Sequence, residues 1–149
     1  LVGLRDLSPL AAVLSDSTRC LLLDLLLNGP LTIDVMADKA GVSRTAVEKH
    51  LTVLMQYGLV ERRASTAGRL RYYYYLSEGA EVFLEAYQIA AENYISYRLD
   101  EVKEEIERLK RAEELGFLTQ AEIEVGLKRL NQLVNALLPL LGRKGNEIA

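Results

Sequence analysis

Two apolar stripes in the second half of the chain limit the fold more than any other feature. In each stripe, apolar residues recur at alternating steps of four and three, the seven-residue repeat of helices that pack side by side. The members are Ile95, Leu99, Val102, Ile106 and Leu109 in the first stripe, and Ile123, Leu127, Leu130, Val134, Leu137 and Leu141 in the second. The sequence therefore predicts two helices that pair along their length.

The residues between and before the stripes define the ends of these helices. Gly116 breaks the pattern between the stripes, so a short turn makes the two helices antiparallel. Thr119 and Glu122 form a capping-box pattern at the start of the second helix. The first helix begins after Ser77 and either continues without a break or bends near residues 90–93. We expect residues 77–149 to form an antiparallel coiled-coil hairpin.

Residues 1–76 change their apolar period often, which indicates several short elements. Three helices are predicted from residues that cap helix N-termini and from glycines that end helices. Ser15–Ser17 precede a helix to Leu27, Thr32 precedes a helix over Ile33–Ala40, and Ser43 precedes a helix over Arg44–Tyr57. In the third helix, Val47, Leu51 and Leu54 form one apolar stripe, so the opposite side faces solvent.

After Gly58 the pattern alternates with a period of two, which predicts strands over residues 59–63 and 69–76. Gly68 suits a loop position with positive φ between them. Helix, short helix, tight turn, helix and two-stranded hairpin is the element order of a winged helix-turn-helix. The predicted fold class is mainly α with a small β-hairpin wing (α+β). It consists of a winged helix-turn-helix domain over residues 1–76, followed by the helical hairpin over residues 77–149.

The charges are distributed unevenly along the chain. The 149 residues carry a net charge of −3, yet residues 43–71 contain six basic and two acidic side chains, a local net charge of +4. Salt screens charges that lie more than roughly 10 Å apart, so a local basic patch matters more for phosphate contact than the total charge. The basic patch therefore favours nucleic-acid binding by the first half although the whole chain is acidic, and a solvated charged face is the alternative.

Several classes of protein are excluded. No apolar run approaches the roughly 20 residues that span a bilayer, and no secretory signal is visible, so we expect no membrane partner and a cytoplasmic location. The chain has one cysteine, Cys20, and one histidine, His50, which argues against an internal disulfide and a metal site. Without a nucleophile–histidine–acid set or a phosphate-binding glycine loop, we expect no enzyme and no cofactor. Cys20 is interpreted as a small buried hydrophobe, and a redox switch is the alternative.

The ordered motifs of residues 10–78 resemble those of ArsR-type winged-helix transcriptional regulators. The matching segments are Asp16-Ser17-Thr18-Arg19, Gly29-Pro30-Leu31-Thr32, Ala40–Val47, His50-Leu51 with Leu54, Gly58-Leu59-Val60, Gly68-Arg69 and Tyr72-Tyr73. The resemblance implies a regulator of transcription that binds double-stranded DNA, and we expect a homodimeric repressor. Metal-sensing members of the family carry paired cysteines or clustered histidines and carboxylates. This chain lacks them, so metal sensing is not implied.

A recognition helix enters a major groove about 12 Å wide with polar side chains at its N-terminal outer face. The family's base-contacting positions correspond to Arg44, Thr45, Glu48 and Lys49, and Ser43 with the first-turn amides can hold a phosphate. For Glu48, an ion pair with Arg44 is the alternative. The wing would contact the flanking DNA through Arg62, Arg63, Thr66, Arg69 and Arg71.

The helical hairpin offers more apolar surface than one pair of helices uses, and a large exposed apolar patch usually marks an interface. We therefore expect a homodimer that forms through the two stripes, with an intramolecular cover for the winged domain as the alternative. The candidate dimerisation residues are Leu99, Val102, Ile106, Leu109, Ile123, Leu127, Leu130, Val134, Leu137 and Leu141.

Two other functions fit the sequence. One is a PadR- or MarR-like regulator that binds a small apolar effector between the winged domain and the hairpin, where Tyr87, Tyr94 and Tyr97 would line the pocket. The other is a winged-helix module that binds a protein instead of DNA. Salt distinguishes the last case, because phosphate binding weakens steeply with ionic strength and an apolar contact does not.

Overall fold

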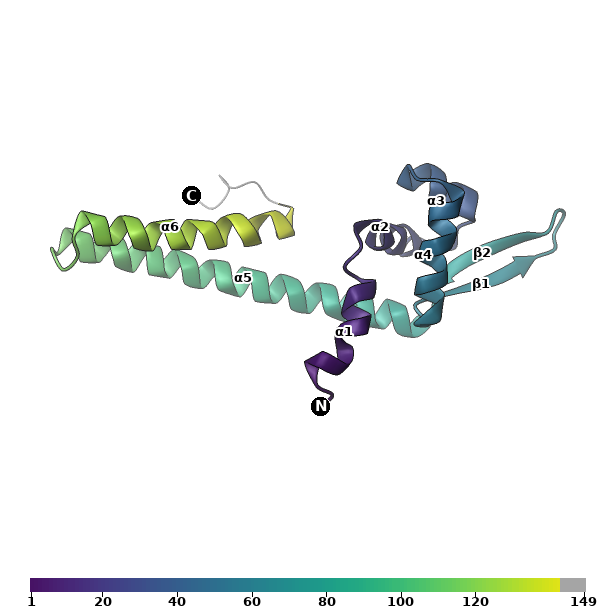
Figure 1. The fold of residues 1–149 in the computed structure, drawn as a ribbon, viewed down its shortest axis with the longest axis horizontal. Coiled ribbons are helices and arrows are strands. Elements are labelled where there is room, and N and C mark those ends of the chain that lie inside the picture. Colours follow the sequence, from purple (N-terminus) through teal and green to yellow (C-terminus); the bar gives the residue numbers. More distant parts are fainter. Residues whose placement is uncertain (143–149) are drawn as a thin grey trace. The chain divides into compact units, whose positions relative to one another are not determined.

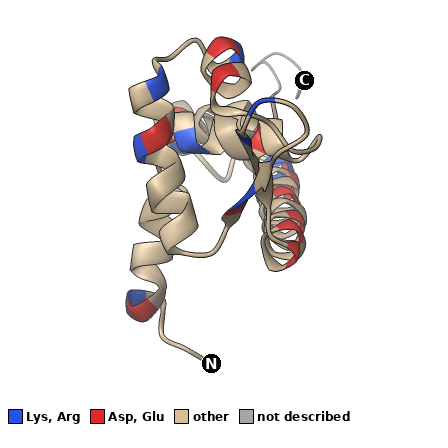
Figure 2. Ribbon diagram, turned by 90° about the vertical axis from the view of Figure 1, so that its right-hand side faces the viewer, with Lys and Arg blue, Asp and Glu red and all other residues tan. Residues whose placement is uncertain are grey.

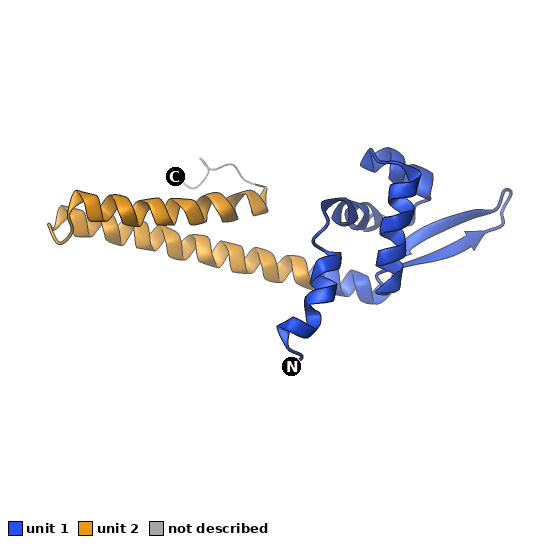
Figure 3. Ribbon diagram, in the orientation of Figure 1, with its two compact units in different colours: residues 1–85 blue, residues 86–149 orange. Residues whose placement is uncertain are grey.

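The structure is a computed structural model that describes residues 1–142. It contains two compact units, Leu1–Glu85 and Ala86–Ala149, and the division falls within the longest helix (Figures 1 and 3). The elements are α1 (Leu4–Val13), α2 (Ser17–Leu26), α3 (Ile33–Ala40), α4 (Arg44–Gln56), β1 (Val60–Ser65), β2 (Arg71–Leu76), α5 (Glu78–Glu114), α6 (Gln120–Leu137) and the 3-10 helix η1 (Leu138–Leu141). The predicted fold class is confirmed, because a two-stranded wing follows the helix-turn-helix in a mainly helical chain.

Helix α1 was not predicted from the sequence. It starts after Gly3 without a side-chain cap, and Pro9 lies inside it. Proline has no N–H to donate to the carbonyl four residues earlier, which here is that of Arg5. The Ser8 hydroxyl donates to this carbonyl at 2.8 Å and supplies the missing hydrogen bond. Val13 at the end of α1 is buried, and Leu10 and Leu14 pack against the core of the first unit.

Helices α2, α3 and α4 begin where side-chain oxygens can accept hydrogen bonds from free backbone amides. The oxygens of Asp16, Thr32 and Ser43 accept from the amides of Arg19, Val35 and Ala46 at 2.9, 3.4 and 3.1 Å. The Thr32 and Ser43 caps were predicted from the sequence, as were the bounds of α3. The three helices enclose a core that includes fully buried Leu22, Met36, Val47, Leu51 and Leu54.

The wing is an antiparallel pair in which Val60 lies opposite Leu76 and Ser65 opposite Arg71. Leu31 forms an isolated bridge with Tyr74 on the other side of β2, which anchors this strand to the segment before α3. Tyr74 and Leu76 are buried in the core, while the tip of the wing is exposed. Gly68 at the tip has a φ of +84°, as predicted for the loop.

Ser77 connects the wing to α5. Its hydroxyl donates to the carbonyl of Gly58 at 2.7 Å and accepts from the amide of Ala80 at 3.1 Å, so it caps α5 and holds the end of the turn after α4. Its amide also donates to the carbonyl of Leu59. The following helix is one uninterrupted element over Glu78–Glu114, through the residues where a bend was an open alternative.

In the second unit, α6 packs on the later part of α5. Ile95, Leu99 and Val102 of α5 are buried together with Leu130 and Val134 of α6. The predicted capping box is present, because Thr119 and Glu122 each accept from the other's backbone amide. Gly126 faces α5 so closely that a Cβ atom there would lie 3.0 Å from Cδ1 of Leu109.

The predicted second helix extends too far at its C-terminal end. Helix α6 ends at Leu137, and the chain continues to Leu141 as η1. Pro139 explains the change, because it has no N–H for the next α-helical hydrogen bond. Leu138 remains fully buried in this altered geometry.

Within residues 1–142, none of the helices combines the length and the apolar character that a membrane crossing requires.

The core of the helical hairpin provides a test of the second unit. Leu130 is 3% exposed, whereas Leu140 is 66% exposed. We expect Leu130→Ala to lower the free energy of unfolding by about 2–5 kcal/mol, because the truncation leaves a cavity. The matched Leu140→Ala change should stay within about 0.5 kcal/mol. Urea unfolding followed by circular dichroism measures both, and equal effects of the two variants would contradict the described packing.

Candidate nucleic-acid interface

The N-terminal half of α4 presents polar side chains to solvent. Arg44, Thr45, Glu48 and Lys49 are all exposed. On the opposite side, Val47, Leu51 and Leu54 are almost completely buried, and this burial fixes the rotation of the helix about its axis. Ser43 is exposed and caps the helix, so the free amides of the first turn point outward beside the same surface. This face has the composition and position of a recognition helix.

Arg44 forms an ion pair that the sequence did not reveal. Its Nη1 lies 3.1 Å from Oδ1 of Asp34 on α3, and both side chains are largely exposed, at 63% and 71%. The alternative pairing of Arg44 with Glu48 is therefore not the one that the structure contains. An exposed ion pair of this kind contributes at most about 1 kcal/mol to stability, so Arg44 can exchange Asp34 for another anion at low cost.

A groove joins the start of α4 to the base of the wing. It has a volume of about 620 Å³, and its basic lining residues are Arg44, Arg69 and Arg71. Asp34 and Tyr72 line the same groove. The structure thus brings together one arginine of the helix-turn-helix and two of the wing, which lie 25 or more positions later in the sequence. Guanidinium groups can bind phosphate oxygens, so the groove is a candidate phosphate site, although the side chain of Arg71 alternates with Tyr72 and shares the strand face of Tyr73.

The two arginines of β1 lie on different faces of the wing. The guanidinium carbon of Arg62 is 4.6 Å from the ring centroid of Tyr72, and that of Arg63 is 5.5 Å from the ring centroid of Tyr75. Side chains alternate along a strand, so neighbours in sequence point to opposite sides. Arg62 shares its tyrosine with the groove described above, whereas Arg63 does not line that groove. Thr66 is exposed at the wing tip.

Acidic groups accompany the basic ones on the first unit. Lys and Arg positions (blue in Figure 2) and Asp and Glu positions (red) both occur on its helices and wing. Asp34 shows the consequence most directly, because its carboxylate lies in the same groove as Arg44, Arg69 and Arg71. The positive potential of this groove is therefore partly neutralised from within the chain.

The structure gives no candidate for a metal centre in the part of the chain that it describes, residues 1–142. Cys20 is partly buried on α2, and its thiol donates to the carbonyl of Leu14 at 3.1 Å. Burial raises the pKa of the Cys20 thiol, and the carboxylates of Asp24 and Asp16 raise it further. His50 Nε2 lies 3.9 Å from Oδ1 of Asp16, so the histidine sits beside the cap of α2, away from the exposed face of α4.

Asp16 is held in its charged form by the backbone. A hydrogen bond from the Arg19 amide lowers the pKa of the Asp16 carboxyl, against the opposing effect of desolvation. His50 and Arg19 lower this pKa further through their charges. A carboxylate whose pKa is depressed by folding stabilises the fold above its unfolded pKa and loses this contribution as the pH falls through the folded value. Asp16 therefore contributes at neutral pH as a charged helix cap.

Each of the ten candidate dimerisation residues is buried or half-buried within one chain. Leu99, Val102, Ile123, Leu130 and Val134 are buried, and Ile106, Leu109, Leu127, Leu137 and Leu141 are half-buried. One chain thus uses both stripes to join α5 to α6. The same seven-residue repeat is expected within one chain and between two, so the sequence pattern alone could not separate these arrangements.

A different face of α5 is apolar and exposed. Ala90, Tyr94 and Tyr97 follow each other at steps of four and three, which places them along one side of the helix. Ile89 flanks them, and Tyr94 and Tyr97 are 60% and 65% exposed. Tyr87, the third tyrosine considered as a pocket residue, is exposed as well. We call Ile89, Ala90, Tyr94 and Tyr97 the tyrosine face of α5.

These features define a winged helix-turn-helix, with the exposed face of α4 in the place of the recognition helix. Residues 16–62 match the family model described as the bacterial regulatory protein, arsR family. This segment, which runs from the cap of α2 into β1, is therefore similar to an ArsR-family helix-turn-helix, and the resemblance seen in the sequence is confirmed. No curated protein sequence matches the chain.

Solved structures agree with this assignment. The homodimeric winged helix-turn-helix DNA-binding domain Mb0332 from Mycobacterium bovis is 25% identical, with a TM-score of 0.55 over 63% of this chain and 85% of that one. A crystal structure of a fragment 1–100 from the same organism is 27% identical, with a TM-score of 0.51 over 60% and 94%. The reduced transcriptional regulator YodB from B. subtilis, at 19% identity and a TM-score of 0.52 over 57% and 84%, shares the fold.

The environment of Cys20 predicts low thiol reactivity. The thiolate is the reactive form, and a raised pKa lowers its fraction at neutral pH. We expect iodoacetamide to modify the folded protein at pH 7.5 at least about tenfold more slowly than the urea-unfolded chain, with the rate rising as the pH increases. Mass spectrometry measures the modification, and Cys20→Ser gives the background. Equal rates for the folded and unfolded chains would show that the thiol is accessible and would contradict its interpretation as a buried hydrophobe.

Proposed function

We propose that the chain is a sequence-specific regulator of transcription that binds double-stranded DNA as a homodimer and acts as a repressor. The observation that carries this proposal is the exposed polar face of α4 beside a groove lined by Arg44, Arg69 and Arg71. The ArsR-family match over residues 16–62 supports it. As a regulator of bacterial genes the protein would act in the cytoplasm, and it would have no enzymatic activity of its own.

The proposed mechanism places α4 in the major groove. Arg44, Thr45, Glu48 and Lys49 then face the base edges, where arginine or lysine can pair with guanine and a carboxylate can accept from cytosine. Ser43 and the first-turn amides of α4 contact a phosphate. Contacts to phosphates fix the position of the helix, and contacts to bases supply the sequence preference.

The wing would bind the DNA backbone beside that groove. Arg69 lines the groove with Arg44 and can contact a phosphate beside the bases that α4 reads. The side chain of Arg71 alternates with Tyr72 and points to the other face of the wing. Thr66 at the exposed tip and Arg62 on the same strand pair extend this surface. Arg62 also stacks on Tyr72, which restricts its side chain before DNA arrives. Arg63 lies on the opposite face and contributes through long-range charge alone.

A homodimer would place two recognition helices on successive half-sites about 34 Å apart, one turn of DNA. The heptad stripes are largely buried within one chain, so we place the dimer contact on the tyrosine face of α5. Tyrosine is enriched at protein interfaces, because its ring is apolar and its hydroxyl forms hydrogen bonds. Bound at an operator, such a dimer would exclude polymerase without any further partner, which favours repression over activation.

Selection of bound genomic fragments with the purified protein tests the function directly. We expect enrichment of short inverted repeats, with binding that weakens as salt increases, because phosphate contacts release counterions. Enrichment without symmetry would contradict the dimer. Binding of no fragment at low salt would contradict DNA recognition and favour a winged-helix module that binds protein.

The recognition helix and its ion pair give a matched set of variants. Arg44→Ala and Lys49→Ala should each weaken operator binding by about 1–3 kcal/mol and leave the fold intact, because both residues are exposed. Asp34→Asn should act in the opposite direction. It releases Arg44 from its partner, and we expect binding up to about fivefold tighter, the equivalent of one exposed ion pair.

Asp38→Asn is the control for the ion pair. Asp38 is exposed on the same helix as Asp34 and is absent from the groove, so the variant has the same net charge without releasing Arg44. Fluorescence anisotropy with a labelled operator at fixed salt compares the four variants. Equal tightening by Asp34→Asn and Asp38→Asn would mean that total charge, and not the freed Arg44, controls affinity.

Negative charges introduced on the tyrosine face test whether it forms the dimer contact. Tyr94→Glu together with Tyr97→Glu should convert a dimer into a folded monomer, because two carboxylates would be buried against the second copy. Phe117→Glu is the control, since Phe117 is an even more exposed aromatic residue in the turn between α5 and α6. Sedimentation velocity gives the mass, and circular dichroism the helix content. A wild-type chain that sediments as a monomer at tens of micromolar would refute the dimer itself.

A further inference from the structure

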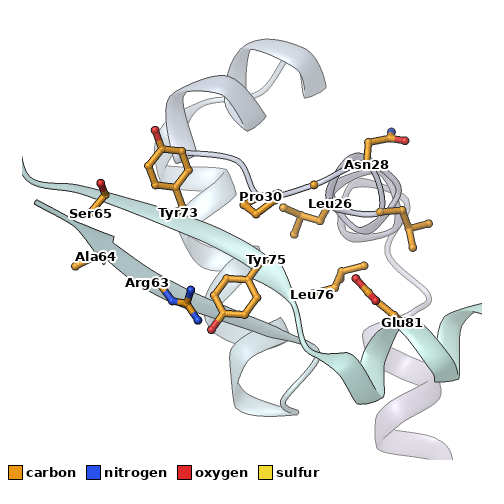
Figure 4. Close-up of a pocket in the computed structure, with 12 residues that line it drawn as sticks. Leu26, Asn28, Pro30, Arg63, Ala64, Ser65, Tyr73, Tyr75, Leu76 and Glu81 are labelled. Carbon is orange, nitrogen blue, oxygen red and sulfur yellow. The ribbon is translucent and has the colours of Figure 1, made fainter. Parts of the chain in front are cut away.

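The first unit contains a second groove, on the face of the wing that bears Arg63. It has a volume of about 690 Å³ and lies between β2, the segment that follows α2 and the first turn of α5 (Figure 4). Its main lining residues are Leu26, Pro30, Arg63, Tyr73, Tyr75 and Glu81. None of these residues belongs to the proposed DNA-binding surface except Arg63, whose side chain lies outside the groove near Arg44. The proposed function therefore leaves this groove unexplained.

The walls of the groove suit a flat apolar group. Leu26 and Leu76 are buried at its base, and Pro30 lies beside them. Tyr73 and Tyr75 are both half-buried, and Figure 4 shows their rings spread to different sides of the β2 ribbon, that of Tyr75 beside Arg63. Pockets for small molecules in proteins typically have volumes of about 300–1,000 Å³, with mostly apolar and aromatic linings and a few polar groups. The groove meets both criteria.

The two charged residues that line the groove, Arg63 and Glu81, lie on different sides of it. Arg63 lies beside the ring of Tyr75, and Glu81 lies on the other side, next to Leu76 (Figure 4). Among the ion pairs within residues 1–142, none involves Arg63 or Glu81. The guanidinium of Arg63 instead rests 5.5 Å from the centroid of Tyr75. It therefore presents donors to a ligand without first having to release a carboxylate.

We propose that this groove binds an aromatic carboxylate. The ring lies between the two tyrosines and the surface of Leu26 and Pro30, and the carboxylate accepts hydrogen bonds from the guanidinium of Arg63. A guanidinium matches a carboxylate through two parallel hydrogen bonds, which are stronger than neutral ones. Glu81 at the other side repels a second negative charge, so the ligand is a monoanion.

The ligand site and the DNA surface share one strand. Tyr73 and Tyr75 of β2 line the ligand groove, while Tyr72 and Tyr74 line the groove that contains Arg44, Arg69 and Arg71. A ligand that shifts β2 would therefore change the position of the wing arginines. This regulatory consequence rests on the proposed function, whereas the binding site itself does not.

Titration calorimetry with 1-naphthoate as the probe tests the binding site. We expect one molecule per chain, and weaker binding of 1-naphthamide, which lacks the charge, and of cyclohexanecarboxylate, which lacks the aromatic ring. Absence of binding at millimolar concentration would overturn the proposal. Equal affinity for the acid and the amide would do the same.

Arg63→Gln and Arg62→Gln form the matched pair of variants. Both arginines are exposed on β1 and each stacks on a tyrosine, but only Arg63 lines the ligand groove. We expect Arg63→Gln to weaken naphthoate binding about tenfold or more, the loss of a charge-assisted hydrogen bond, and Arg62→Gln to leave it unchanged. Glu81→Gln should leave it unchanged or tighten it. Equal effects of the two arginine variants would place the anion elsewhere.

The regulatory consequence needs a separate measurement. Operator affinity with and without naphthoate should differ by about fivefold or more, the usual range of coupling between two sites. The Arg63→Gln protein should lose this difference. If naphthoate binds without changing operator affinity, the coupling between the two sites is contradicted and the ligand-binding site is still supported. If the protein binds naphthoate but selects no DNA, the proposed DNA-binding function is contradicted and the ligand-binding site is still supported.

Discussion

The burial of one side of α4 is the constraint on which the rest of the first unit depends. Val47, Leu51 and Leu54 are held in the core by α2, α3 and the wing, so the helix cannot rotate about its axis. The polar face is exposed as a direct result. The Ser43 cap fixes where the helix starts, and Ser77 holds the turn that follows its end. A solvent-exposed surface is thus positioned almost entirely by contacts on its hidden side.

Strand β2 has two distinct faces because its side chains alternate. Tyr72 and Tyr74 face the groove of Arg44, and Tyr73 and Tyr75 face the groove of Arg63. The run of four tyrosines therefore serves two surfaces, in addition to the packing role expected for bulky residues in a strand. The bridge between Leu31 and Tyr74 holds the centre of this strand, so both surfaces depend on the same attachment to the segment before α3.

Much of the fold could be predicted from local patterns, and most of the site's details could not. Thr32, Ser43 and the Thr119–Glu122 pair determine helix starts through contacts three residues away, so the sequence reveals them. Helix α1 was missed because no side chain caps its start, and the hydrogen bond by which Ser8 compensates for Pro9 is visible only in the folded chain. The pairing of Arg44 with Asp34, and the separation of Arg62 from Arg63, depend on how α3 and the wing pack against α4.

The ion pair between Asp34 and Arg44 also affects how a regulator would search a genome. Random DNA offers phosphates everywhere, and a fully free arginine would be attracted to all of them. If Arg44 binds DNA as proposed, Asp34 is an internal competitor that would weaken these indiscriminate encounters. At a matching site, direct contact between Arg44 and a base edge would offset the loss of the ion pair with Asp34. Under the proposed function, a carboxylate beside the DNA-binding arginine would shorten the time spent at wrong positions and widen the difference in affinity between operator and background.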